Sequence, residues 1–201
     1  MPSAIKTAIQ IFTVQSQIQL LTLKQKSLRV SLPLLSASRD TIEKMVEAIK
    51  TNSKAAGLAA SQIGINERII ICSFTGDVNN LEIMINPTYV NNGTIKEEGW
   101  EGCFSIPLTF AKVSRWKDID VAYYTVTGDV INKPLNGFSA RVYQHECDHL
   151  EGTLMTEQAC EVKICSTKEE FNDFLQVVRK KREEAAAIKD QPCSSSPKCN
   201  P

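Results

Sequence analysis

The chain contains only two histidines, His145 and His149, and they lie four residues apart. Residues i and i+4 lie on one face of an α-helix with adjacent side chains, so two imidazoles at this spacing can hold one metal ion. Glu146 lies between them, as in the H-E-x-x-H pattern of metalloenzymes. The same spacing also occurs by chance on helices, where each ring merely satisfies a buried hydrogen bond. A third metal ligand therefore decides between the two interpretations.

Catalytic zinc-type sites keep three protein ligands and leave one position for water. A metzincin supplies a third histidine, but the pattern here reaches Gly152 and then has Met155 at that position, which excludes this class. A thermolysin-like protease takes a glutamate from a following helix, and Glu169 or Glu170 lies at a suitable separation along the chain. The glutamate alternative stays open at this point.

Cys103 is the other candidate for the third ligand. It lies upstream of the histidines, in the segment 101–107. Gly102 removes a side chain where another backbone could approach, and Pro107 stops regular strand pairing, so the thiol is offered from an irregular segment beside a strand. The other six cysteines are expected to be inert core residues or exposed thiols, namely Cys72, Cys147, Cys160, Cys165, Cys193 and Cys199.

A third segment, residues 55–64, consists almost wholly of small residues around one amide side chain, Gln62. By itself this composition is typical of a tight connection between a helix and a strand. The three segments together resemble the three signatures of the peptide deformylases, which occur in the same order. The matching residues are Gly57-Leu58-Ala59-Ala60-x-Gln62, Glu101-Gly102-Cys103-x-Ser105 and Gln144-His145-Glu146-x-Asp148-His149. The likeness runs from about Leu20 to about Glu157.

The resemblance implies a metal-dependent hydrolase that removes the formyl group from the N-terminal formyl-methionine of nascent polypeptides and releases formate. It implies one divalent metal ion bound by Cys103, His145 and His149. In this family the native ion is Fe(II), with nickel, cobalt or zinc as substitutes, and a thiolate with two imidazoles accepts all of these. The expected rival is a zinc endopeptidase, whose third ligand would be a glutamate.

The resemblance also assigns roles around the metal. Glu146 is the expected general acid and base, while the side-chain amide of Gln62 and the backbone N–H of Phe104 are the expected donors to the oxyanion. The positions that bind the peptide backbone of the substrate are Ala56, Gly57 and Gly102. The residues expected to orient the imidazoles or neighbouring backbone are Gln144 and Asp148.

Four positions depart from the family pattern without removing a metal ligand. Ala55 replaces the first glycine of the first signature, Ser61 stands where proline or threonine is common, and Phe104 replaces leucine. Phe110 occupies the position where the bacterial type has an arginine that holds the substrate backbone. These changes affect positions that bind the substrate in the family, so they bear on substrate binding and selectivity more than on catalysis. They leave a catalytically impaired, ribosome-associated module as an alternative.

Composition favours one domain in a reducing compartment. The chain has 201 residues and 42% hydrophobic content, enough for one substantial core. Lysine plus arginine and aspartate plus glutamate number 23 each, so no global charge points to nucleic acid or a membrane. No stretch reaches the roughly 18 apolar residues of a membrane helix. Because the seven cysteines lack disulfide-scaffold spacing, we expect a monomeric cytoplasmic enzyme.

The first 39 residues contain no acidic side chain, which is the composition of an organellar transit peptide. Residues after about Leu20, however, align with the N-terminal strand of the family. We therefore expect residues 1–17 to be a flexible N-terminal extension, with cleavage for organellar targeting as the less favoured alternative.

The pattern of apolar residues predicts helix, then strands, then helix. Asp40 and Glu43 form an approximate capping box before a core-facing helix, and strand-like runs follow at 67–74, 82–90 and 118–126. From Leu135, apolar residues and both histidines share one helical stripe. This order predicts an α+β fold, with mixed or antiparallel sheets packed around a central metal-binding helix and helices at both ends.

The expected catalytic domain is 18–165, followed by a C-terminal helix over 166–189 and a disordered tail over 190–201. The C-terminal helix has an apolar face and then a charged run at 179–184. A solvated surface helix is the favoured interpretation. Docking on the ribosome through this helix is the alternative, with no other nucleic-acid role and no membrane partner expected.

Overall fold

The computed structural model describes residues 9–52, 55–75, 77 and 79–189. The chain divides into two compact units, Met1–Lys163 and Ile164–Pro201. The first unit is α+β, with helices and antiparallel strands as the sequence predicts. The expected tail at 190–201 and the first eight residues lie outside the described part of the chain.

A five-stranded sheet forms the framework of the first unit, in the order β1-β2-β3-β6-β7. Each neighbouring pair is antiparallel. The strands are β1 (Gly57–Ala59), β2 (Ile69–Cys72), β3 (Glu82–Asn91), β6 (Asp118–Tyr124) and β7 (Val130–Asn136). β2, β3 and β6 lie within the three predicted strand-like runs or nearly so, whereas β1 and β7 were not predicted.

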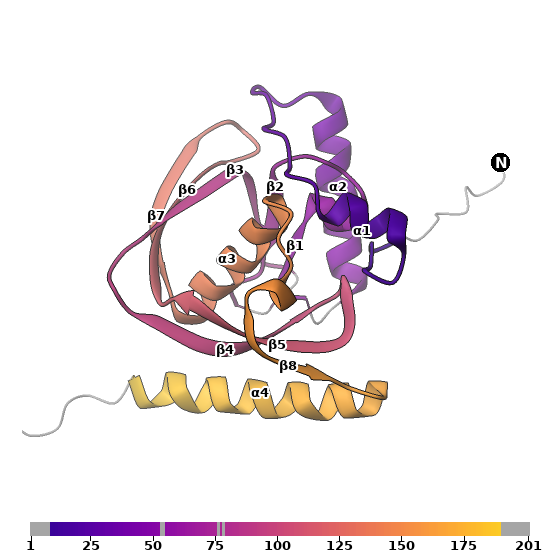
Figure 1. The fold of residues 1–201 in the computed structure, drawn as a ribbon. Helices are drawn as coiled ribbons and strands as arrows, with labels where there is room; N and C mark the ends of the chain where they lie inside the picture. The colour runs from indigo at the N-terminus through magenta and orange to yellow at the C-terminus, as the bar shows by residue number, and fades with distance from the viewer. Residues whose placement is uncertain (1–8, 53–54, 76, 78, 190–201) are drawn as a thin grey trace, which may run out of the picture. The chain divides into compact units, whose positions relative to one another are not determined.

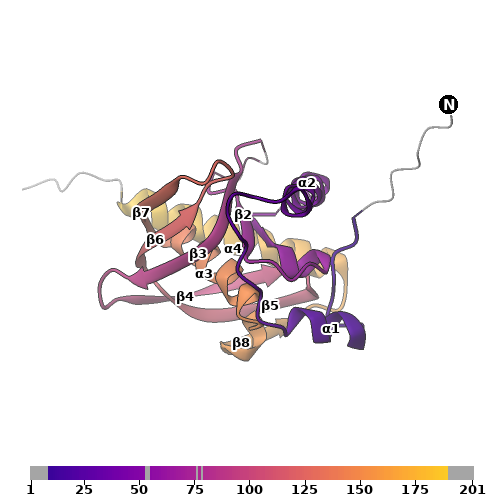
Figure 2. The ribbon, with the colours of Figure 1, turned by 90° about the horizontal axis from the view of Figure 1, so that it is seen from above.

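Two helices cover opposite faces of this sheet, α2 (Ser36–Thr51) and α3 (Gly137–Leu150) (Figures 1 and 2). Strand β2 shows how the sequence specifies both faces. Its alternate residues Ile70 and Cys72 pack in the cluster with α3, while Ile69 and Ile71 pack in the cluster with α2. Because both faces of β2 are buried, the strand is a continuous apolar run rather than an alternating one.

A second sheet has the strand order β4-β5-β8 and contains β4 (Lys96–Cys103), β5 (Ile106–Trp116) and β8 (Ala159–Ile164). β4 and β5 form an antiparallel hairpin whose register shifts between Gly102 and Cys103. Cys103 thus ends its strand at an irregularity, as the neighbouring glycine and proline predicted. The hairpin itself escaped prediction because its residues mix charged, glycine and apolar side chains without a clean alternation.

Three short helices complete the first unit: α1 (Gln17–Leu23), η1 (Ala60–Ile63) and η2 (Met155–Glu157). Ser16 caps the start of α1, and its hydroxyl accepts a hydrogen bond from the Gln19 N–H at 3.5 Å. Residues 9–16 of the expected N-terminal extension include two backbone donors, Phe12 and Val14, that bond to other parts of this unit.

The predicted capping box at Asp40 and Glu43 is wrong. Helix α2 begins at Ser36, with Leu35 at the N-cap position, so Asp40 lies inside the helix. The reason is a tertiary contact that no local pattern shows: Ser38 is buried and its hydroxyl donates to the Glu67 carboxylate at 2.6 Å.

The second unit contains α4 (Lys168–Lys189), close to the predicted C-terminal helix. A capping arrangement fixes its start, because the Thr167 hydroxyl accepts from the Glu170 N–H at 3.2 Å and the Glu170 carboxylate accepts from the Ser166 N–H at 2.8 Å. Among the described residues, no helix combines the length and the apolar character that crossing a membrane requires.

Candidate metal centre and active site

One thiol, at the end of β4, and two imidazoles, on α3, converge at one place in the structure. The ligand atoms of Cys103, His145 and His149 all lie within 4.8 Å of one another. Cys103 Sγ is 3.2 Å from His149 Nε2, and the two imidazole rings meet edge to face with centroids 5.1 Å apart. This convergence is the arrangement that a three-ligand site for a single metal ion requires.

The electrostatics of the cluster favour a thiolate ligand. Burial by itself raises the pKa of the Cys103 thiol, but the adjacent His149 and His145 outweigh burial and hold that pKa well below its ordinary value. A thiolate is the form of cysteine that binds metals. One thiolate with two imidazoles therefore fits a divalent ion of the iron, cobalt, nickel or zinc type.

Glu101 fixes the orientation of His145. The His145 Nδ1–H donates to Glu101 Oε2 at 2.9 Å, which leaves Nε2 as the nitrogen free to bind a metal. Burial raises the pKa of Glu101, but hydrogen bonds from Arg115 and His145 outweigh burial and lower the pKa well below its ordinary range. Glu101 is thus an acceptor-only carboxylate, and Nδ1 must be the donor.

Two arginines hold the Glu101 carboxylate in turn. Arg115 forms a bidentate pair with it, with Nε–Oε1 and Nη2–Oε2 distances of 2.9 Å each, and a third nitrogen of Arg115 bonds to Asp148. Arg141 donates to Glu101 Oε1 at 2.8 Å and also to the backbone oxygen of Val113 at 2.8 Å. The network connects α3 to both strands of the hairpin.

Glu146 lies beside the ligands and is buried, with 4% of its surface exposed. Desolvation raises its pKa to about 7, which is the range suited to a group that accepts and returns a proton near neutral pH. Its side chain packs against the backbone of Gly57, where an added Cβ would lie only 2.8 Å from the carboxyl carbon. In the described part of the chain, Glu146 Oε2 has no hydrogen-bond partner.

Gln62 presents its amide nitrogen to the same centre. Its Oε1 accepts a hydrogen bond from the Ala59 N–H at 2.9 Å, and this contact orients the NH₂ group. Nε2 then donates toward Cys103 Sγ at 3.4 Å and to Ser105 Oγ at 3.2 Å. Phe104 occupies the turn between β4 and β5, next to both of these partners.

The residues expected to support the site contact the backbone and Arg115 rather than the imidazoles. Gln144 accepts from the Trp116 N–H at 3.0 Å and donates to the Trp116 oxygen at 2.8 Å, so it holds the end of β5 on α3. Asp148 accepts from Arg115 and from Gln158. Glu101, Arg115 and Arg141 were not assigned roles from the sequence.

The expected substrate-binding positions lie near the ligands. Gly57 begins β1 beside Glu146, Ala56 immediately precedes it, and Gly102 is the residue before Cys103 on β4. Phe110 pairs with Gly102 across the hairpin, and its side chain is 1% exposed. An apolar core residue therefore occupies the position where the bacterial type of the family has an arginine that holds the substrate.

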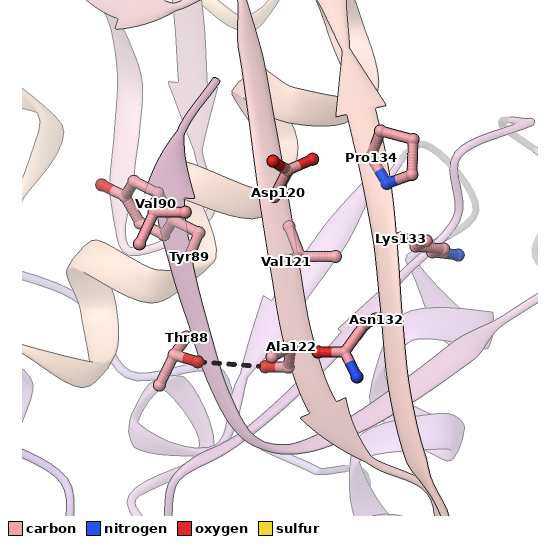
Figure 3. Close-up of a pocket in the computed structure, with 9 residues that line it drawn as sticks. All are labelled: Thr88, Tyr89, Val90, Asp120, Val121, Ala122, Asn132, Lys133 and Pro134. Atoms are coloured by element: carbon pink, nitrogen blue, oxygen red, sulfur yellow. Dashed lines mark hydrogen bonds between the residues drawn. The ribbon is translucent and has the colours of Figure 1, made fainter. Parts of the chain in front are cut away.

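A hollow of about 400 Å³ lies elsewhere, over strands β3, β6 and β7 (Figure 3). It is lined by side chains such as Thr88, Val90, Asp120 and Asn132 and by none of the predicted site residues. We place the active site at the ligand cluster because a thiol, two imidazoles and a carboxylate converge there.

Comparisons with known proteins identify a family for most of the chain. Residues 9–164 match the family described as polypeptide deformylase. The peptide deformylase of Thermotoga maritima is 34% identical over 143 residues, covering 71% of this chain and 84% of that protein. Peptide deformylase 2 of Rickettsia conorii is 35% identical over 180 residues, covering 84% and 87% respectively.

Solved structures give the same result. The crystal structure of the Thermotoga maritima peptide deformylase matches with a TM-score of 0.67 at 29% identity, covering 76% of this chain and 98% of that one. The Plasmodium falciparum peptide deformylase in complex with an inhibitor matches with a TM-score of 0.64 at 29% identity, covering 89% and 99%.

We predict that Glu101→Gln weakens metal binding. The amide cannot act as the charged acceptor for the His145 N–H, so the ring loses its fixed orientation, and metal affinity should fall about 10- to 100-fold. Competition with a chromophoric chelator measures this affinity. Glu98→Gln is the matched control, because Glu98 lies on the same strand in an exposed pair with Lys112. An unchanged affinity in Glu101→Gln would contradict the assignment.

Proposed function

The chain belongs to the peptide deformylase family, and we propose that Cys103, His145 and His149 form its catalytic metal centre. Members of this family are metal-dependent hydrolases that remove the formyl group from N-terminal formyl-methionine. The observation that carries the proposal is the convergence of one thiol and two imidazoles beside a buried carboxylate, Glu146. The comparisons support neither the zinc endopeptidase nor the non-catalytic alternative.

Cys103, His145 and His149 would hold a divalent metal ion, which would supply a Lewis acid that lowers the pKa of a water molecule toward neutrality. Glu146 accepts a proton from the water that attacks the formyl carbon. The carbon–nitrogen bond then breaks, Glu146 returns the proton to the departing amine nitrogen, and formate and a free methionine N-terminus are the products. The pKa of about 7 suits Glu146 to both transfers.

The formyl oxygen gains negative charge during the attack and requires fixed donors. The Gln62 amide nitrogen and the Phe104 backbone N–H are the proposed pair. Gln62 is already oriented by its bond from the Ala59 N–H, so it requires no reorganisation when the charge develops. A donor of this kind is typically worth about 3 to 4 kcal/mol of transition-state stabilisation.

We assign the substrate backbone to Ala56, Gly57 and Gly102, which border the cluster. Because Phe110 is buried and uncharged, contacts of the substrate with this part of the hairpin are made through backbone groups rather than an arginine. The proposed substrates are formyl-methionine peptides emerging from the ribosome. We propose Fe(II) as the native ion and a monomeric enzyme of the cytoplasm, where a thiolate ligand stays reduced.

Helix α4 offers a second proposal, that the enzyme docks on the ribosome. The helix carries a basic run from Arg179 to Arg182, and ribosomal RNA is a strongly anionic surface. A substrate that emerges from the ribosome makes such docking useful.

The first prediction tests the role of Glu146. The parent enzyme should deformylate formyl-Met-Ala-Ser and leave its acetylated analogue intact. Glu146→Gln should keep its metal and lose about 10²-fold or more in kcat, because proton transfer is blocked while the ligands remain. Glu151→Gln, an exposed carboxylate just beyond α3, is the control. Near-normal turnover by Glu146→Gln would exclude the proposed role.

The second prediction tests the ligand set. Cys103→Ser removes the only negative donor, so it should bind metal more weakly and turn over poorly. Cys147→Ser changes a core cysteine of the same helix as the histidines and should cost stability while leaving metal content unchanged. Metal analysis after desalting distinguishes the two variants. Equal metal content in all three proteins would remove Cys103 from the ligand set.

The third prediction tests ribosome docking. Replacing Arg179, Lys180, Lys181 and Arg182 by glutamate should abolish salt-sensitive co-sedimentation with ribosomes, while turnover of free formyl peptides stays unchanged. Co-sedimentation at several salt concentrations measures the effect. If the parent protein does not sediment with ribosomes, or if both forms do so equally, α4 is a surface helix only.

A further inference from the structure

We propose that residues 12–14, here called the N-terminal strap, position the two groups that hold the developing oxyanion. This inference rests on the proposed roles of Gln62 and Phe104. The strap leads into α1 (Figure 2) and bonds to both of the loops that carry these groups.

The strap connects the two loops through backbone hydrogen bonds of good geometry. The Phe12 N–H donates to the Gln62 backbone oxygen at 2.7 Å, and two residues later the Val14 N–H donates to the Ser105 backbone oxygen at 2.9 Å. Gln62 lies in η1, whereas Ser105 follows Phe104 in the turn between β4 and β5. One short segment is thus bonded to two residues, Gln62 and Ser105, that are 43 positions apart in the chain.

The strap is itself held in place. The Thr13 N–H donates to Gln19 Oε1 on α1 at 2.8 Å. The Phe12 ring packs over Gly64, which has a φ of +80°, and an added Cβ there would lie within 3.0 Å of the ring atom Cε1. Phe12 and Val14 also pack against the apolar cluster that contains Cys103 and Ile106.

This arrangement matters for catalysis because oxyanion donors act through preorganisation. The Gln62 side chain and the Phe104 N–H must point at one oxygen atom, and a displacement of about 1 Å can cost about 10²-fold in rate. The Gln62 Nε2 bond to Ser105 Oγ also links the two loops, but it uses the NH₂ group that is proposed to donate to the substrate oxygen. The strap bonds use only backbone groups and leave that side chain available.

The strap limits how much of the N-terminus can be removed without loss of activity. Cleavage near residue 17, the alternative for organellar targeting, would remove both strap donors. Any processed form that keeps full activity must therefore retain Phe12 and Val14.

Two substitutions at position 14 distinguish the contribution of the Val14 N–H from that of its side chain. Val14→Pro removes the donor to Ser105 and keeps an apolar side chain, whereas Val14→Ala keeps the donor and removes most of the side chain. We expect Val14→Pro to lower kcat on formyl-Met-Ala-Ser about 10-fold or more, with KM and metal content close to the parent. Val14→Ala should keep kcat within about twofold, because the hydrogen bond that orients the turn remains.

Phe12→Pro and Phe12→Ala repeat the comparison at the other bond, and Gln10→Pro is the control for a proline in an exposed position outside the strap. Thermal unfolding of each variant identifies any loss of folded protein. Equal kcat in the proline and alanine variants, measured on folded and metal-loaded enzyme, would overturn the proposal. If the parent shows no turnover at all, the proposed function fails instead.

Hydrogen exchange on the unmodified protein tests the two strap hydrogen bonds without any substitution. The amide protons of Phe12 and Val14 should exchange much more slowly than in an unstructured chain, since both are bonded to the core of the unit. If these two amide protons exchange at the rate of an unstructured chain, the proposal is overturned, whether or not the variants fold.

Discussion

The buried carboxylate of Glu101 is the interaction on which the metal centre depends. This carboxylate accepts hydrogen bonds from His145 Nδ1–H and from two arginines, Arg115 and Arg141. These three donors compensate its negative charge. A buried charge without partners is costly, and removal of one partner from such a set costs about 3 to 5 kcal/mol. Loss of any one partner would leave a buried charge uncompensated, so the members of the network hold one another in place. The His145 ring is oriented by its hydrogen bond to this network.

Helix α3 provides both the ligands and the means of holding the strand that supplies the third ligand. Gln144 binds the backbone of Trp116 on β5, and Arg141 binds the backbone of Val113 on β5 and of Glu97 on β4, the last at 2.5 Å. Gly99 makes room for the guanidinium, because an added Cβ would lie 2.9 Å from its central carbon. The separation between Cys103 and the histidines is thus set by other side chains of the same helix, Arg141 and Gln144.

Local sequence predicted those parts of the molecule whose pattern repeats at short range. The two histidines at helical spacing, the apolar run of β2 and the irregular segment at Cys103 are each specified by neighbouring residues. The β4–β5 hairpin was not predicted because charged, glycine and apolar residues are mixed along its strands without a clean alternation. The roles of Arg115 and Arg141 were missed for a related reason: an arginine in a sequence reads as a surface residue, and only the fold shows that Arg115 is 4% exposed. Glu101 lies within a recognised signature, and an acidic residue two positions before a ligand was the available signal.

The proposed active site is an assembly of separate chain segments that meet only in the folded unit. η1 contributes Gln62, the β4–β5 hairpin contributes Cys103 and Phe104, and α3 contributes Glu146 with the two histidines. α3 fixes the ligands against the hairpin through charged and amide side chains, whereas the strap fixes η1 against the hairpin turn through backbone bonds. Metal binding and oxyanion binding therefore rest on different contacts, and loss of one set need not remove the other. Metal content therefore reports on the contacts that hold the metal ligands. The value of kcat at full metal content reports on the contacts that hold the oxyanion donors.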